Sequence, residues 1–364
     1  MTVTDAKITT TSSKGTVSIL IGIFMLMIGC KTKDNTPGPT QINYDQVNLV
    51  ADTASLGAAR VDVNLKNAWG ISISPTGIFW ISSNHSGSTV VYDTTGKQLL
   101  ASVAIPLGAD PRGGSPTGVI FNSSGDFIIP GKGKSLFIFS TENGILSAWN
   151  GGTGATTLTV ADQSSTGAVY KGLALANDGG SNFIYAADFH NARVDVFDRD
   201  FAFVTSKPFS DPGIPPGYAP FNVQNINDQL YVTYAKQLGP DNADDQAGMG
   251  NGYVDIYSPA GVLIRRFASQ GTLNSPWGIV QAPATFGQAA NSILIGNFGD
   301  GHINVYDTNG AYQGQLMTKG TAIAIPGLWA ITFNAASSAD PNKLYFAAGP
   351  DGETHGLFGY LKIR

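Results

Sequence analysis

A short pattern that returns about every 50 residues limits what this chain can fold into. The pattern is a bulky residue, then a small one, then an aliphatic one. It occurs at Trp69-Gly70-Ile71, Thr117-Gly118-Val119, Lys171-Gly172-Leu173, Phe221-Asn222-Val223, Trp277-Gly278-Ile279 and Trp329-Ala330-Ile331. The small residues, at 70, 118, 172, 222, 278 and 330, are separated by 48, 54, 50, 56 and 52 residues. A period of this length indicates an array of similar supersecondary units.

Each unit continues with two more short apolar runs, then a Gly or Asn turn and a fourth run. In the second unit, Phe127 to Pro130 is expected to form the second strand and Leu136 to Phe139 the third. The chain has 45 Gly and only 13% charged residues, which suits many short strands and turns. Six units of four strands predict an all-β, six-bladed β-propeller in one domain, 44–364. The expected blades span about 65–106, 114–152, 169–209, 218–268, 273–317, and 325–364 together with 44–51.

The last unit predicts how the ring closes. It ends at Arg364 after its third run, so the chain there offers no fourth strand. The segment from Tyr44 to Ala51 precedes the first unit and reads as a strand. We expect it to complete the last blade and to cover an edge that would otherwise be open.

The N-terminal region predicts export. Lys7 and Lys14 precede an apolar stretch, 17–29, that ends at Cys30. Its 13 residues fall short of the roughly 20 that a membrane-spanning helix needs, so a signal peptide over 1–29 is expected. Leu26 to Cys30 resembles a bacterial lipobox, which implies lipidation of Cys30, a tether over 30–43 and a place in the cell envelope, periplasmic or at the surface. An ordinary secretory signal with an incidental cysteine is the alternative.

Charge and cysteine content exclude some functions. The formal net charge is -5 and no cluster of Lys or Arg could follow a phosphate backbone, so nucleic acid is not an expected partner. Cys30 is the only cysteine. The expected propeller therefore has neither disulfides nor a thiol nucleophile.

Two resemblances support the fold. The segment from Ile184 to Asp198 resembles an NHL repeat, which implies an NHL/TolB-like propeller. The segments 67–71, 251–257 and 275–279 resemble an uncharacterised family of exported bacterial propellers. Some members of that family have a PEP-CTERM sorting tail, whereas this chain ends with Tyr360-Leu361-Lys362-Ile363-Arg364.

Histidines are the first candidate metal ligands. His85, His190 and His302 fall between the second and third strands of their units, and these loops open on one face of the disc. Six-bladed propeller enzymes such as lactonases and amidating lyases hold a metal on the channel axis, and imidazoles suit Zn. The alternative is that these histidines are turn residues, because such loops lie outside the inner strands.

Carboxylates and amides are the second group of candidates. Asp188, Asn297 and Asp300 lie at the same loops and could bind Ca²⁺, or could bond their own turn backbone. Asn67 and Asn222 lie at inner strands, close to the axis. A long insert, 236–252, carries Asp244 and Asp245 and is expected to project over the channel mouth as a lid or partner contact.

Tryptophans recur at the starts of inner strands. Trp69, Trp277 and Trp329 are expected to pack between blades, with a sugar-stacking platform as the alternative.

Two functions follow from these observations. The first is a non-enzymatic exported protein that binds a small ligand or a partner protein on the loop face. The second is a metal-dependent hydrolase, lactonase or lyase at the channel mouth, with a divalent metal, Ca or Zn, as its cofactor.

Overall fold

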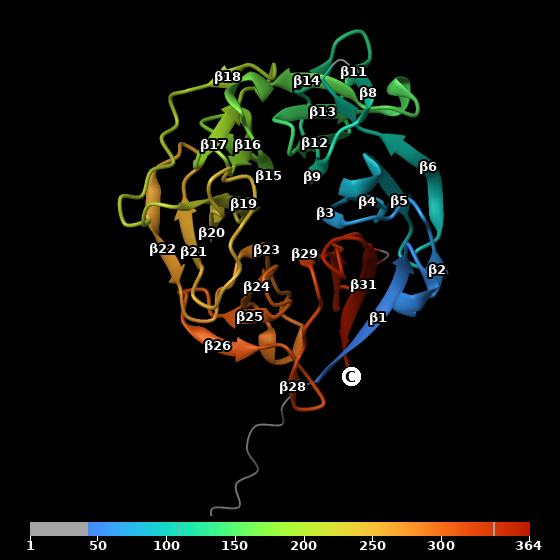
Figure 1. Cartoon of the computed structure of the whole chain (residues 1–364), viewed down its shortest axis with the longest axis vertical. Helices are drawn as coiled ribbons and strands as arrows, with labels where there is room; N and C mark the ends of the chain where they lie inside the picture. Colours follow the sequence, from blue (N-terminus) through green and yellow to red (C-terminus); the bar gives the residue numbers. More distant parts are fainter. Residues whose placement is uncertain (1–42, 109, 338) are drawn as a thin grey trace, which may run out of the picture. The chain divides into compact units, whose positions relative to one another are not determined.

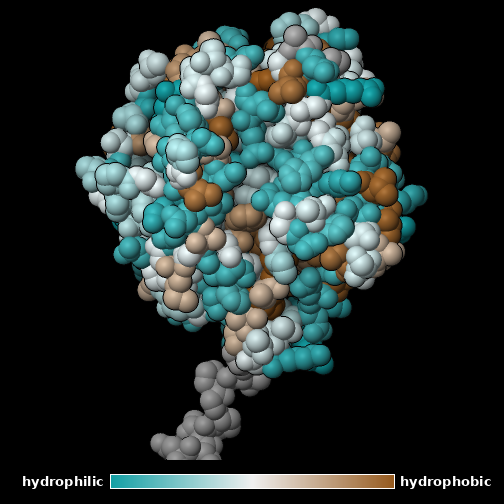
Figure 2. Space-filling view, in the orientation of Figure 1, coloured by the Kyte–Doolittle hydropathy of each residue, from teal (hydrophilic) through white to brown (hydrophobic). Residues whose placement is uncertain are grey.

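Six antiparallel sheets surround a central axis in the computed structural model (Figure 1), which describes residues 43–108, 110–337 and 339–364. The expected six-bladed β-propeller is confirmed. Within these residues no helix is long and apolar enough to cross a membrane. The face drawn in Figure 2 is covered mostly by hydrophilic residues, with hydrophobic ones in small groups between them.

Each blade has four main strands, numbered outward from the axis. Blade 1 consists of β3 (Ala68–Ile73), β4 (Phe79–Ser83), β5 (Ser88–Tyr92) and β6 (Gln98–Ala104). Blade 2 consists of β9 (Pro116–Phe121), β12 (Phe137–Thr141), β13 (Ile145–Trp149) and β14 (Leu158–Asp162). Blade 3 consists of β15 (Tyr170–Asp178), β16 (Ser181–Asp188), β17 (Arg193–Phe197) and β18 (Phe203–Val204).

The other three blades repeat this order. Blade 4 consists of β19 (Tyr218–Ile226), β20 (Gln229–Lys236), β21 (Gly252–Tyr257) and β22 (Leu263–Ser269). Blade 5 consists of β23 (Pro276–Gln281), β24 (Ile293–Asn297), β25 (Ile303–Tyr306) and β26 (Tyr312–Gln315). Blade 6 consists of β29 (Leu328–Phe333), β30 (Lys343–Ala348), β31 (Leu357–Ile363) and β1 (Tyr44–Ala51).

Short elements connect or border the blades. The strands among them are β2 (Arg60–Val61), β7 (Pro106–Leu107), β8 (Asp110–Gly113), β10 (Ile128–Ile129), β11 (Gly133–Lys134), β27 (Met317–Thr318) and β28 (Thr321–Ala322). The 3-10 turns are η1 (Ala54–Leu56), η2 (Asn84–Ser86), η3 (Gly151–Thr153), η4 (Ser164–Thr166) and η5 (Gly287–Ala289).

The predicted ring closure is confirmed. β1 pairs antiparallel with β31, from Tyr44 opposite Ile363 to Ala51 opposite Leu357. β2 pairs parallel with the outer side of β1. The N-terminal strand therefore joins the two ends of the propeller within one sheet.

The strand assignment that the sequence predicts for blade 2 is wrong. β12 pairs directly with β9, so the run expected to be the third strand is the second, and β13 is the third. The segment expected to be the second strand instead forms a separate hairpin, β10–β11. Phe127 and Ile129 there are buried in a hydrophobic cluster, so the run has the apolar pattern of a blade strand without belonging to the sheet. The turn at Glu142 and Asn143 consequently connects the second and third strands.

All six inner strands are irregular at the repeated pattern. The pairing register of each with its neighbour shifts at this point, in β3, β9, β15, β19, β23 and β29. Such bulges redirect a side chain, here the bulky residue of the pattern. The small residue follows because neighbouring inner strands approach closely: a Cβ on Gly278 would lie 2.6 Å from the Trp329 carbonyl oxygen.

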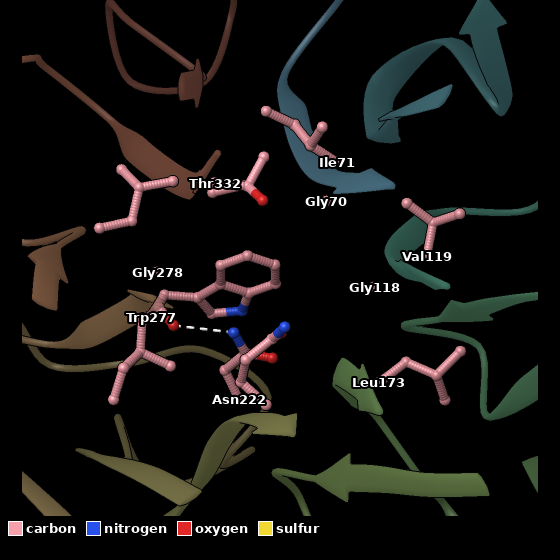
Figure 3. Close-up of a pocket in the computed structure, with 13 residues that line it drawn as sticks. Gly70, Ile71, Gly118, Val119, Leu173, Asn222, Trp277, Gly278 and Thr332 are labelled. Atoms are coloured by element: carbon pink, nitrogen blue, oxygen red, sulfur yellow. Dashed lines mark hydrogen bonds between the residues drawn. The ribbon is translucent and has the colours of Figure 1, made fainter. Parts of the chain in front are cut away.

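Aromatic side chains close the channel. Trp69 stacks on Trp329 with ring centres 3.5 Å apart, and Trp277 meets both edge-on. Figure 3 shows Trp277 among the inner strands, where its carbonyl oxygen accepts a hydrogen bond from Asn222. The three rings are at most 4% exposed, which supports packing between blades over a sugar platform.

The rings of Trp69, Trp277 and Trp329, which we call the plug, separate the two mouths of the channel. The loop mouth is the end at which the inner strands begin and the loops between second and third strands lie. The turn mouth is the opposite end, where first and second strands are connected. A cavity of about 600 Å³ lies in the loop mouth and one of about 630 Å³ in the turn mouth.

Candidate functional site

Ionisable side chains from five of the six blades line the loop-mouth cavity. Its ionisable lining residues are His85, Glu142, Lys171, Asp244, Asp245 and Glu353. All but Lys171 come from loops between second and third strands. Phe298, from the same loop of blade 5, also lines the cavity, and Trp69 and Trp329 of the plug border it.

Lys171 is the one charged residue in the repeated inner-strand position. The other blades place Trp69, Thr117, Phe221, Trp277 and Trp329 there. Lys171 is only 2% exposed, and its Nζ lies 2.5 Å from Glu142 Oε1 and 3.3 Å from Asp244 Oδ1. The bulge that directs tryptophans toward the axis elsewhere therefore directs an ammonium group there in blade 3.

Lys171 and Glu142 form a charged pair. Burial alone would lower the pKa of Lys171, but Glu142 and Asp244 outweigh it and hold this pKa above its ordinary value. Burial would raise the pKa of Glu142, but Lys171 outweighs it and holds this pKa below the usual range. Asn84 Nδ2 also donates to Glu142 Oε2 at 2.9 Å. Both groups are charged at neutral pH.

The carboxyls of Asp245 and Glu353 differ from that of Glu142 in the direction of their pKa shift. Burial raises the pKa of each carboxyl above its ordinary value. Asn67 Nδ2 donates to Glu353 Oε2 at 2.6 Å. Ser275 lowers the pKa of Asp245, but by less than burial raises it. The Oδ2 atom of Asp245 is buried and has no hydrogen-bond partner among the described residues. Neither carboxyl forms an ion pair with any described residue.

The predicted projection of the blade 4 insert over the mouth is confirmed. We call residues 237–251, between β20 and β21, the lid. It rests on blade 3, where Gln237 Nε2 donates to the Phe189 carbonyl at 2.6 Å, and on Asn274, whose Oδ1 accepts from Gly248 at 2.6 Å. Ala243, Asp244 and Asp245 of the lid line the cavity.

The histidines are not brought together. His85 lines the cavity, with Nε2 3.4 Å from Asn67 Nδ2. His190 Nδ1 lies 2.9 Å from the Asp241 carbonyl oxygen, and His302 Nδ1 lies 2.8 Å from that of Ile323. Across residues 43–108, 110–337 and 339–364, no three His, Cys, Asp or Glu side chains are grouped so that they could hold a metal.

Most of the predicted oxygen ligands bond their own turns or the plug. Asp188 accepts from the backbone of Val169 and Asn191, and Asp300 accepts from His302 N and from Asn297. Asn222 is held by the Trp277 carbonyl. Asn67 links the plug to the cavity, because its Oδ1 accepts from Trp329 Nε1 at 3.2 Å while its Nδ2 reaches Glu353. Cys30 lies outside the described residues.

Three residues of the cavity escaped the sequence interpretation. Lys171 stands out in the repeat itself as a charge in a position that is otherwise apolar or uncharged. Glu142 was missed because the sequence interpretation took β12 for the third strand of blade 2, so the turn after it was not recognised as a loop between second and third strands. Glu353 carries no local feature that distinguishes it from an ordinary loop residue.

Comparisons with known proteins agree with this fold. No family model matches the chain. Two proteins of Acanthamoeba polyphaga mimivirus, both called uncharacterized, are similar in sequence. L690 is 36% identical over 331 residues, 87% of this chain and 85% of that protein. R648 is 34% identical over 330 residues, 87% of this chain and 80% of that protein.

Solved structures share the fold at low identity. A virginiamycin B lyase from Staphylococcus aureus is 13% identical, with a TM-score of 0.53 over 89% of this chain and all of that one. A calcium-binding regucalcin from Agrobacterium tumefaciens is 14% identical, with a TM-score of 0.50 over 82% of this chain and 92% of that one. These likenesses show a propeller fold. Membership of an exported bacterial family, with or without PEP-CTERM tails, stays a prediction.

Proposed function

Since the chain belongs to the family of the two mimivirus proteins, each of which matches 87% of it, we propose a function that uses the loop mouth: binding of a small polar ligand in the cavity. One observation carries this proposal. The cavity of about 600 Å³ has the size of a small-molecule site, and its walls come from segments far apart in the chain that converge with six ionisable groups.

The buried ion pair supports binding over mere packing. Placing Lys171 and Glu142 in a plugged channel mouth costs desolvation that a bulky apolar residue, as in blades 1, 5 and 6, would avoid. A fixed charged pair facing an accessible cavity can instead orient a polar ligand. The lid then acts as one wall of the site.

A divalent metal does not fit this point of the fold. The regucalcin that shares this fold is a calcium-binding protein. Here the Lys171 ammonium already lies between Glu142 and Asp244, so a divalent cation at these oxygens would meet a like charge. The metal-dependent hydrolase or lyase is therefore not the function that the geometry favours.

A ligand screen with a cavity-filling control tests the proposal. Full-length protein is screened by ligand-detected NMR against small amines, carboxylates, sugars and polyols. Ala243→Trp fills the cavity from the lid without changing a charge. We expect at least one class to bind the wild type and to be lost in Ala243→Trp.

Two outcomes contradict it. Either no class binds, or every binder remains bound to the filled variant. If a protein that co-purifies in stoichiometric amount is lost in Ala243→Trp while no small molecule binds, a partner protein is the occupant and the small-ligand proposal fails.

We also propose that the chain is exported and anchored through Cys30. The support is the N-terminal sequence, with two lysines before an apolar stretch that ends at this cysteine. Cys30→Ser should move the full chain from the membrane fraction to the soluble fraction and abolish fatty-acid labelling. Unchanged partition and absence of label in the wild type would contradict the anchor.

A further inference from the structure

The loop-mouth cavity has more carboxyl groups than cations. Glu142, Asp244, Asp245 and Glu353 line it, against a single lysine. Lys171 is already paired with Glu142 and Asp244. Asp245 and Glu353 form no ion pair with a described residue, although Lys171 acts on both at longer range.

A stack of three aromatic rings borders the same cavity. Trp69 stacks on Trp329 at 3.5 Å, and Trp329 stacks on Phe298 at 3.9 Å. Lys171 Nζ lies 5.1 Å from the centre of the Trp69 ring, at one end of the stack. An ammonium between carboxylates and an aromatic ring is a favourable arrangement for a cation.

The other end of the stack lacks such a cation. Phe298 is only partly buried and lines the cavity, and Trp329 is its sole aromatic neighbour among the described residues. No described Lys or Arg lies over its ring. The cavity therefore repeats, with Phe298, Asp245 and Glu353, the components that surround the Lys171 ammonium.

We infer that the ligand carries an ammonium or guanidinium group, which binds in this cavity to the carboxyls of Asp245 and Glu353, with the ring of Phe298 as a further wall. This inference rests on the proposed function and specifies its ligand. A ligand that is anionic or uncharged would leave the two carboxyls as they are.

Binding of a cation should be coupled to proton release. Burial raises the pKa of both Asp245 and Glu353, so each carboxyl keeps its proton to a higher pH than an exposed carboxyl does. The ionisable groups that share the cavity with them are Glu142, Lys171, Asp244 and His85. A bound cation favours the ionised carboxylates, so affinity should rise with pH.

Calorimetry with three matched probes tests the inference. Full-length protein is titrated with 1,5-diaminopentane, 1,5-pentanediol and glutarate, which share a five-carbon chain and differ in charge. We expect only the diamine to bind, more tightly at about pH 7.5 than at about pH 5.5. Glu353→Gln and Asp245→Asn should each weaken it by about tenfold or more, and Phe298→Leu should weaken it less.

Controls keep the result interpretable. Asp228→Asn removes an exposed carboxylate from the β19–β20 turn, at the far end of blade 4, and should bind like the wild type. His85→Gln should retain the pH dependence. If a carboxyl variant does not fold, Phe298→Leu still tests the site, because it changes no charge.

The outcomes separate this inference from the proposed function. If the diol or glutarate binds and Ala243→Trp abolishes it while the diamine does not bind, the cavity is a ligand site and the cationic class is wrong. Diamine binding that is unaffected by Glu353→Gln, Asp245→Asn and Phe298→Leu overturns the inference as well. If none of the probes binds, the inference fails, and the broader screen alone decides the proposed function.

Discussion

The two mouths of the channel hold cavities of nearly equal volume and opposite chemistry. The loop mouth has six ionisable lining residues, whereas the turn mouth is lined by apolar and neutral polar residues such as Ile73, Phe121 and Phe333. The inner strands β3, β15 and β29 contribute to both cavities, with residues near their beginnings at the loop mouth and residues further along at the turn mouth. At the loop mouth, the loops between second and third strands provide every ionisable lining residue except Lys171, whereas most of the lining of the turn mouth comes from the inner strands themselves. In this propeller the loops therefore supply all the ionisable groups of the cavity except Lys171, and the strands supply Lys171, the plug and the scaffold.

Opening the ring should have the largest effect, because both mouths depend on closure. Deletion of residues 43–51 removes Tyr44, Leu49 and Val50, each at most 6% exposed, and exposes the edge of β31. We expect a loss of about 5 kcal/mol or more in the free energy of unfolding, measured by urea denaturation. An unchanged denaturation midpoint would show that β1 does not close the ring.

Removing the plug should come next, because it would join the two cavities. Trp329→Ala removes the middle ring of the stack and leaves a void that the surrounding strands cannot fill. We expect the free energy of unfolding to fall by about 4 kcal/mol and ligands to bind more weakly in the loop-mouth cavity. A loss below about 1 kcal/mol would mean that Trp329 is not central to the packing.

Removing one partner of the Lys171–Glu142 pair should show how much the buried charges of the loop mouth affect the free energy of unfolding. Glu142→Gln leaves the buried Lys171 ammonium without its main counter-charge and should cost about 3 kcal/mol. Lys171→Met in the same background places an apolar side chain where other blades have tryptophan, and should restore most of this loss. If the double variant is no more stable than Glu142→Gln, the unpaired Lys171 ammonium is not what lowers the free energy of unfolding.

The same pair predicts a pH dependence. The pKa of Glu142 is lower in the folded protein than in the unfolded chain. Its contribution is therefore fully present above the unfolded pKa and is lost as pH falls through the folded pKa. The wild type should lose more stability on acidification in this range than the Glu142→Gln, Lys171→Met double variant, as thermal melts at several pH values would show. Parallel curves would contradict this assignment.

A substitution at the turn mouth should have a small effect. Phe121 lines that cavity and is partly exposed, so Phe121→Ser should cost about 1 kcal/mol and leave ligand binding at the loop mouth unchanged. The reason is that the plug separates the two cavities. Altered binding would show that the mouths communicate.

Chelation should have the smallest effect. Protein purified without added metal should contain no stoichiometric transition metal by elemental analysis, and its melting temperature should not change with a chelator. One bound metal per chain, lost in His190→Ala, would instead revive the metal-dependent enzyme.

The sequence alone determined the number of blades, the position of the inner strands and the closure by Tyr44 to Ala51. These are periodic or local properties: the repeated bulky, small and aliphatic residues reflect the bulge and the close approach of inner strands in every blade. The sequence also placed Asp244 and Asp245 in an insert above the mouth. It did not pair the second unit correctly, because buried Phe127 and Ile129 imitate a blade strand.

The composition of the site was decided by the tertiary structure. Glu142, Lys171, Asp244 and Glu353 lie in four different blades and share a cavity only after the ring closes. His85, His190 and His302 all lie in loops between second and third strands but do not meet in space. His85 lines the cavity, whereas His190 lies against the Asp241 carbonyl and His302 against that of Ile323. A repeat specifies what each blade looks like. Which side chains meet on the axis depends on loop lengths and on closure, and these join residues that are far apart in the chain.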